Sequence, residues 1–199
     1  MQMPRLVRTI AVLAATLLFA PAAMAADVGE LGNPKAKVTV IEYASVTCPH
    51  CMRFNNNVFP AFKAKYIDTG KVLYQFREFP TDPVQLSAAG FLMARCAPAD
   101  KYLAVIDALF HGQEKLYQTQ DAKGWLIEAG KAGGLDEAKI QACVQDKANL
   151  DAFNARVETA FNTAKIQATP TFVIGATKLE GEETLEDLSK AIDPLLAAK

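Results

Sequence analysis

The chain has 199 residues, of which 51% are hydrophobic and 22% charged, with 21 basic and 22 acidic side chains. This balance excludes a disordered tail, which would have low hydrophobicity, and a nucleic-acid-coating protein, which would be strongly basic. The length is sufficient to bury a hydrophobic core without covalent cross-links. The four cysteines therefore need another explanation.

The first 25 residues are typical of a secretory signal peptide. Arg5 and Arg8 form a positive region, residues 10–20 form an apolar core, and a small-x-small pattern ends at Ala25. The alternative is a membrane anchor, but this core is shorter than the about 20 apolar residues that span a bilayer. We therefore expect cleavage after Ala25, which changes the net charge from −1 to −3, and export to a compartment where thiols are oxidised.

Three β-rich segments predict the strands of an α/β fold. Val38–Ala44 is nearly continuous in apolar residues, as expected of a strand covered on both faces, and Val72–Phe79 alternates. Thr171–Ile174 is followed by Gly175 and the short run Thr177–Leu179, which favours a hairpin.

Helical periodicity fills most of the remaining chain. Residues 48–66 carry an apolar stripe, so the predicted order begins strand, helix, strand. Residues 83–165 contain no convincing strand and predict about four helices inserted between the two halves of the α/β unit. A final helix is expected to start near Thr184, with Asp187 placed for a capping box, and to end before Pro194.

The motif Cys48-Pro49-His50-Cys51 lies where the first strand leads into the first helix. A zinc site would need two further ligands at suitable spacing, and Cys96 and Cys143 each stand alone. A c-type haem needs histidine directly after the second cysteine, where this chain has Met52. An inert structural disulfide remains an alternative, but a redox-active dithiol accounts better for the position of the pair.

The expected position of Cys48 favours a reactive thiol. At a helix start its sulfur lies near unpaired backbone N–H groups and the positive end of the helix dipole, which stabilise the thiolate. Pro49 suits the first helical position, and a protonated His50 places a cation beside the sulfur. Cys51, one turn later, is the expected resolving thiol. A stabilised thiolate favours the reduced form, so the disulfide becomes a stronger oxidant.

Taken together, these motifs resemble the DsbA family of thioredoxin-fold disulfide oxidoreductases. The resemblance rests on the CPHC motif after Val40–Tyr43, on the helical insertion, and on Ala168–Phe172 before a hairpin and a last helix, and it covers residues 34–199. It implies an α/β thioredoxin fold with an inserted all-helical domain. The expected division is a signal peptide at 1–25, a thioredoxin-like domain at 26–82 and 166–199, and the helical insertion at 83–165.

The resemblance also assigns a substrate-binding role to two residues before the third strand. The family carries a cis-proline facing the active disulfide, and the matching residue is Pro170, preceded by Thr169. From the sequence alone, Pro170 could equally be a trans residue at the strand edge. With a cis bond, the backbone of Thr169 could pair with an extended segment of an unfolded substrate protein.

Glu42 matches a family position that holds a buried acid beneath the active site. A buried carboxylate is costly, so we expect Glu42 to transfer protons for Cys51 instead of merely facing a polar pocket. The lysine that usually accompanies this acid on the next strand is not evident in this sequence, since that strand offers Gln75 and Arg77.

Cys96 and Cys143 are either two buried thiols or a second disulfide. Export favours pairing, and some DsbA-like proteins carry such a bridge in the helical domain. A Cys96–Cys143 disulfide would close a long loop and stabilise the fold by about 4 kcal/mol. Its expected role is structural.

The leading functional hypothesis is a periplasmic enzyme that introduces disulfides into unfolded or reduced exported proteins through Cys48 and Cys51. The resemblance implies reoxidation by a DsbB-like membrane partner, with no metal, organic cofactor or nucleic acid. One alternative is a disulfide isomerase or reductase kept reduced by a membrane donor. The short segment between Ala25 and Pro34 favours a monomeric oxidase over that alternative. Thr169 does not separate the two, because a threonine before the cis-proline occurs in several branches of the family. A metal-delivery or binding protein is the alternative of another class.

Overall fold

The computed structural model describes residues 29–198. The expected signal peptide at 1–25 lies outside the described residues. Within the part of the chain that is described, no helix combines the length and the apolar character needed to cross a membrane.

The sheet has five strands in the order β1-β3-β2-β4-β5. β2 (Val38–Ala44) and β3 (Val72–Glu78) are parallel, β4 (Thr171–Ile174) is antiparallel to β2, and β5 (Thr177–Glu180) closes the expected hairpin. β1 (Glu30–Gly32) pairs antiparallel with β3 at the far edge and is not predicted by the sequence. Three residues that include a glycine carry too little periodicity to indicate a strand.

The helix after β2 lies close to the expected residues 48–66 but is not uniform. A π-helical turn precedes Pro60, whose nitrogen cannot donate a hydrogen bond to the preceding turn. The consecutive segments are α1 (Pro49–Arg53), a π turn (Phe54–Val58), α2 (Phe59–Phe62) and a second π turn (Lys63–Ile67).

Aromatic side chains of this helix pack against the sheet. The ring of Phe54 lies 4.6 Å from that of Phe172 on β4, and the ring of Phe59 lies 4.9 Å from that of Tyr74 on β3, measured between centroids. Aromatic pairs at these distances add stabilisation beyond their buried area. The packing therefore holds the start of α1 in a defined place over the end of β2.

Residues 83–165, all of which are described, contain no strand, as expected, but the prediction of about four helices is wrong. Gly112 separates two helices, and Gln120, with a φ of 57°, ends the next, so short helices replace one longer helix. The segments are α3 (Val84–Arg95), a 3₁₀ turn (Ala99–Lys101), α4 (Tyr102–His111), α5 (Gln113–Thr119), α6 (Ala122–Ala132), α7 (Glu137–Gln145) and α8 (Lys147–Asn162).

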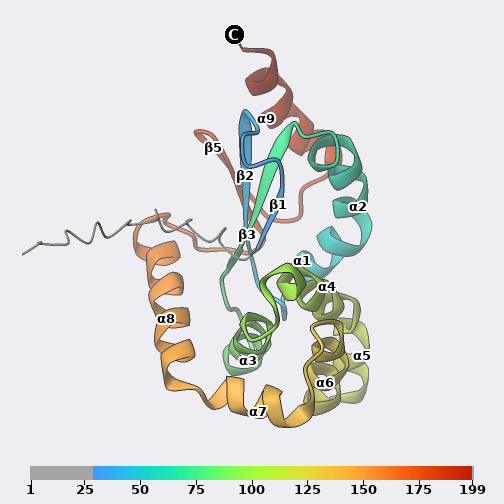
Figure 1. Cartoon of the computed structure of the whole chain (residues 1–199). Coiled ribbons are helices and arrows are strands. Elements are labelled where there is room, and N and C mark those ends of the chain that lie inside the picture. Colours follow the sequence, from blue (N-terminus) through green and yellow to red (C-terminus); the bar gives the residue numbers. More distant parts are fainter. Residues whose placement is uncertain (1–28, 199) are drawn as a thin grey trace, which may run out of the picture.

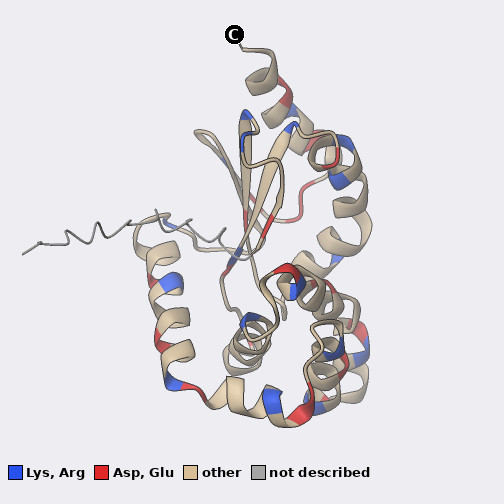
Figure 2. Ribbon diagram, in the orientation of Figure 1, with Lys and Arg blue, Asp and Glu red and all other residues tan. Residues whose placement is uncertain are grey.

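Figure 1 shows these helices gathered beyond one end of the sheet, with α8 returning along one side toward the strands. Acidic and basic residues alternate along α8 (Figure 2). The mixture of both signs agrees with the near-balanced charge of the whole sequence.

The last helix, α9 (Leu185–Ala197), begins as the sequence predicts. Thr184 caps it by accepting a hydrogen bond from the backbone N–H of Asp187. The expected end before Pro194 is wrong, because the helix continues through that residue. Pro194 has no N–H to donate to the Lys190 carbonyl, and both residues are exposed on the surface of the helix.

Glu78, the last residue of β3, joins the sheet to the helices. Its buried carboxylate accepts hydrogen bonds from Arg95 Nε of α3 at 2.7 Å and from Arg156 Nε of α8 at 2.6 Å. The hydroxyl of Tyr102 on α4 donates a third at 3.1 Å. These partners satisfy a charge that would be costly to bury alone.

Candidate active site

The Cys48–Cys51 pair lies at the junction between β2 and α1. Cys48 is the N-cap residue of α1, with extended backbone angles (φ −82°, ψ 122°), and Pro49 occupies the first turn, where a missing N–H has no cost. Cys51 lies one turn later and is completely buried. Both cysteines are free thiols in this structure. The junction places the first sulfur at the positive end of the helix, as the sequence predicts.

The surroundings of Cys48 stabilise its thiolate and lower its pKa from 9.0 to about 5. The largest cause is a hydrogen bond from the Cys51 thiol, and partial burial opposes the shift. The Thr169 side chain and the backbone N–H groups of Cys51 and His50 lower the pKa further. Cys48 is therefore a strong candidate for the attacking and leaving sulfur.

Cys51 experiences the opposite effect. Burial, followed by the hydrogen bond and negative charge of Cys48 and the charge of Glu42, raises the pKa of the Cys51 thiol well above its usual value. At neutral pH Cys51 keeps its proton and becomes a nucleophile only when a base removes it. The pair thus has one ionised and one protonated sulfur.

The loop before β4 faces Cys48. The Thr169–Pro170 peptide bond is cis, and the Thr169 carbonyl oxygen lies 3.4 Å from Cys48 Sγ, which donates a hydrogen bond to it when the thiol is protonated. The Pro170 carbonyl accepts a bond from the Gly181 N–H at 2.8 Å, which ties this loop to the hairpin. The two residues expected to face the dithiol are therefore brought next to it.

Glu42 is buried beneath the pair, and its partner is Tyr74. The Tyr74 hydroxyl donates a hydrogen bond to Glu42 Oε2 at 2.6 Å. Burial, with a smaller effect of the charge on Cys48, raises the pKa of Glu42 to about 8, and the Tyr74 hydrogen bond opposes this rise. A carboxyl that titrates near neutral pH can accept and return a proton.

Tyr74 is absent from the sequence-based interpretation, which considered only Gln75 and Arg77 on this strand. Gln75 donates to Glu30 at 2.6 Å, and Arg77 lies 3.8 Å from the same carboxylate. Alternate residues of β3 are buried, beginning at Val72 and including Tyr74. The period of two could have placed Tyr74 on the face of Glu42.

The His50 ring is directed differently from the expectation. Its Nδ1 lies 2.7 Å from Arg53 Nη2 and 3.3 Å from Glu182 Oε2, and Arg53 also donates from Nε to Glu182 at 2.8 Å. The contribution of His50 to the lowered pKa of Cys48 comes from its backbone N–H. The ring therefore belongs to an exposed cluster with Arg53 and Glu182.

A buried set of hydroxyl groups supports the loop before Cys48 and is also missed by sequence reasoning. Ser45 Oγ lies 2.9 Å from Ser87 Oγ of α3 and 3.0 Å from Thr47 Oγ1, and it accepts a bond from the Thr81 N–H at 3.1 Å. Short polar residues in a loop carry no periodicity that would indicate such contacts.

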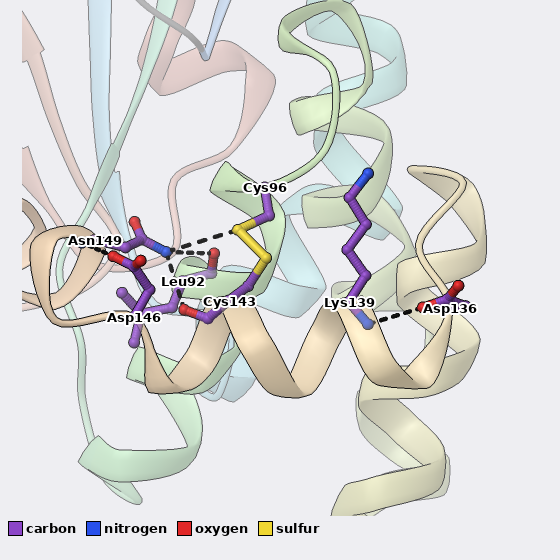
Figure 3. Close-up of a disulfide and its surroundings, with 7 residues drawn as sticks. All are labelled: Leu92, Cys96, Asp136, Lys139, Cys143, Asp146 and Asn149. Atoms are coloured by element: carbon purple, nitrogen blue, oxygen red, sulfur yellow. Dashed lines mark hydrogen bonds between the residues drawn. A yellow bond between two sulfur atoms is a disulfide. The ribbon is translucent and has the colours of Figure 1, made fainter.

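The other two cysteines form a disulfide that joins Cys96 at the end of α3 to Cys143 of α7 (Figure 3). Asn149 at the start of α8 donates from Nδ2 to the carbonyls of Leu92 and Cys143 at 3.0 and 3.3 Å. Asp136 caps α7 through the N–H of Lys139 at 2.8 Å. The disulfide therefore lies among hydrogen bonds that are made at the ends of α7 and α8.

Known proteins resemble this chain over most of its length. A thioredoxin family model matches residues 27–194. Curated relatives from Rickettsia typhi and Rickettsia prowazekii are 30% identical over 167 residues, which is 83% of this chain and 61% and 60% of theirs. The chain thus spans about three fifths of the length of these relatives. Disulfide bond formation protein D of Bacillus subtilis is 27% identical over 85% of this chain and 77% of its own.

Solved structures show the same fold. Wolbachia pipientis alpha-DsbA1 has a TM-score of 0.77 at 32% identity, covering 87% of this chain and 92% of that chain. Oxidised Bacillus subtilis BdbD has a TM-score of 0.69 at 24% identity, covering 85% and 92%. The expected thioredoxin fold is therefore confirmed. With the family match and the sheet topology, these similarities show that the chain belongs to the DsbA-like family of thioredoxin-fold proteins.

Proposed function

We propose that this protein is a thiol:disulfide oxidoreductase that introduces disulfides into exported proteins. The observation that carries the proposal is the opposite treatment of the two sulfurs, with the pKa of Cys48 lowered to about 5 and that of Cys51 raised. A stabilised Cys48 thiolate favours the reduced form and makes Cys48 a good leaving group. Both effects favour transfer of the disulfide to a substrate, and they support an oxidase over an isomerase or reductase.

The proposed reaction has two exchange steps. A substrate thiolate attacks Cys48 Sγ of the Cys48–Cys51 disulfide, forms a mixed disulfide and releases the Cys51 thiolate. Cys51 takes a proton, for which Glu42 is the donor. A second substrate thiolate attacks the substrate sulfur of the mixed disulfide and releases the Cys48 thiolate. Two electrons pass from the substrate, which becomes a disulfide, to the protein, which becomes a dithiol.

The residues around the dithiol receive roles that follow from their contacts. Thr169, whose carbonyl lies next to Cys48, would bind an extended substrate segment through its backbone, and the cis bond to Pro170 would keep that backbone facing the dithiol. Pro49 and the N–H of His50 keep the first sulfur at the helix end. The Cys96–Cys143 disulfide is assigned a structural role.

The cellular setting is proposed from the sequence and the relatives. A cleaved signal at 1–25 would direct a monomer to the periplasm, where a DsbB-like membrane partner would reoxidise Cys48 and Cys51. The proposed domains are a thioredoxin-like unit at 26–82 and 166–199 and a helical insertion at 83–165. Their boundaries fall in segments that connect β3 to α3 and α8 to β4.

The test is the redox equilibrium of Cys48–Cys51 with glutathione, together with oxidation of reduced, unfolded ribonuclease. We expect a strongly oxidising pair and restored ribonuclease activity. A potential near that of thioredoxin would contradict the oxidase direction.

A Cys51→Ala variant tests the separate roles of the two thiols. With a partner protein that already contains a disulfide, its Cys48 thiolate should displace one partner sulfur as a thiolate and form a mixed disulfide with the other. This adduct should persist, because no Cys51 thiol is present to attack Cys48 Sγ and release the partner, and it should be visible by mass spectrometry. The matched Cys48→Ala variant should accumulate none. Equal trapping by both variants would contradict the assigned order of attack.

A further inference from the structure

Two side chains of α5 hold the loop that leads into Cys48. Gln113 Nε2 donates hydrogen bonds to the carbonyls of Val46 at 2.8 Å and Cys48 at 3.3 Å. The Tyr117 hydroxyl donates to the carbonyl of Thr47, which lies between them, at 2.5 Å. Three consecutive carbonyls of the redox loop are thus bonded to one short helix that is distant in sequence.

Gln113 occupies an unfavourable position for an amide. Its side chain is completely buried, and within residues 29–198 its Oε1 has no hydrogen-bond partner. A buried acceptor without a donor carries a desolvation penalty. The Cys48 carbonyl already accepts the N–H of Met52 at 3.1 Å, so the bond from Gln113 is a second one. Burial of this amide costs free energy at Oε1. We therefore explain its presence by the hydrogen bonds that Nε2 donates to the carbonyls of Val46 and Cys48.

We propose that Gln113 and Tyr117 are positioning residues that keep the Cys48 sulfur at the start of α1 and thereby set how strongly the pair oxidises. This inference rests on the proposed function. The direction in which the chain enters α1 depends on the peptide groups of Val46 and Thr47. Holding their carbonyls leaves the sulfur next to the N–H groups of the first turn, which stabilise its thiolate.

The surroundings of Tyr117 support a link to the sulfur. Burial and the negative charge of Cys48 both raise the pKa of Tyr117, so its hydroxyl remains a donor at neutral pH and lies within the field of the thiolate. Tyr117 is nevertheless 40% exposed, at the rim of the site. The loop before α1 is thus held by a buried residue, Gln113, and by a partly exposed residue, Tyr117.

The first test replaces Gln113 by methionine, which keeps the length and volume of the side chain but removes the donor. We expect the Cys48 pKa, followed by thiolate absorbance during a pH titration, to rise by about one unit. The equilibrium constant with glutathione should shift about tenfold toward a weaker oxidant, which corresponds to about 30 mV. The matched control is Gln118→Met, an exposed glutamine on the same helix, which should leave both values unchanged.

Tyr117→Phe provides an independent test, because it removes one hydroxyl from a partly exposed side chain and leaves the core intact. It should shift both quantities in the same direction by a smaller amount, about twofold in the equilibrium constant. If either variant lost stability to urea but kept the wild-type pKa and equilibrium, the residues would be merely structural and the inference wrong. A wild-type protein without an oxidising pair would contradict the proposed function instead.

Discussion

The Cys48–Cys51 pair is a dithiol and the Cys96–Cys143 pair is a disulfide, although Cys48 is no more exposed than Cys143. Cys48 and Cys143 have the same exposed fraction, 7%. Cys48 is next to N–H groups, a hydroxyl and a second thiol that stabilise its charge, whereas Cys143 is bonded to Cys96 between two helix segments. The hydrogen-bond donors around each sulfur, which differ between the two members of a pair, therefore determine its chemistry.

The largest expected effect at a fixed pH is the loss of stability on removal of the Cys96–Cys143 disulfide. Replacing Cys96 and Cys143 together by alanine should lower the free energy of unfolding by about 4 kcal/mol, because the bridge closes a loop of 47 residues' separation. Urea unfolding measures this loss. Thiol exchange at Cys48 should persist in this variant, whereas Cys48→Ala should abolish exchange and keep the helical bridge. If the double variant were as stable as the wild type, the Cys96–Cys143 disulfide would have no structural role.

The second prediction concerns the carboxyl beneath the reactive pair. The folded pKa of Glu42 is raised to about 8 from 4.5, so its contribution to stability is complete below pH 4.5 and is lost as pH rises toward 8. Glu42→Gln removes this dependence. Between pH 5 and 7.5 the variant should gain about 3 kcal/mol relative to the wild type, at about 1.4 kcal/mol for each pH unit. Urea unfolding of the two reduced proteins measures this gain, and parallel pH profiles would contradict the prediction.

A third prediction compares the two redox states. The lowered pKa of Cys48 applies only to the dithiol, since a disulfide does not titrate. Its stabilisation is present above the unfolded-state value near 9 and is lost as pH falls toward 5. The stability of the reduced form relative to the oxidised form should therefore increase from pH 5 to 9, by at most about 1.4 kcal/mol per pH unit. Denaturation in both states checks this, and a constant difference would contradict it.

The smallest predicted effect concerns Tyr74. Tyr74→Phe removes the donor that lowers the pKa of Glu42, so that pKa should rise by about one further unit while the ring packing is kept. An infrared titration of the carboxyl band measures the shift. Tyr66→Phe is the control, because Tyr66 donates to Asp193 at 2.7 Å outside the site. Equal carboxyl titrations in the wild type and Tyr74→Phe would show that the hydroxyl has no such effect.

The parts of the fold and site that the sequence predicts are local. The CPHC motif after a buried strand places Cys48 at a helix start, and Thr184 with Asp187 places the start of α9, because both patterns span a few neighbouring residues. Pro194 shows the limit, because an exposed proline is tolerated within α9 although proline usually ends a helix.

The remaining contacts depend on packing between distant segments. Gln113 and Tyr117 are more than 60 residues from the loop whose carbonyls they bind, and no local pattern distinguishes them from other polar residues of a short helix. The alternation of buried residues along β3 predicts that the Tyr74 side chain points into the core. Its hydrogen bond with Glu42 cannot be predicted in this way, because it also requires the register of β2 and β3. Such pairs follow from the assembled sheet and helices.

Glu78 has a consequence for motion. It bonds to Arg95 on α3, which follows β3, and to Arg156 on α8, which precedes β4. The chain therefore leaves the sheet and returns to it through two helices that are tied to one carboxylate. Helices α3–α8 cannot slide along the sheet without breaking both ion pairs. Separation of either helix from the end of β3 would leave the charge of a buried carboxylate without one of its two ion partners, so Glu78 keeps both helices attached to the sheet.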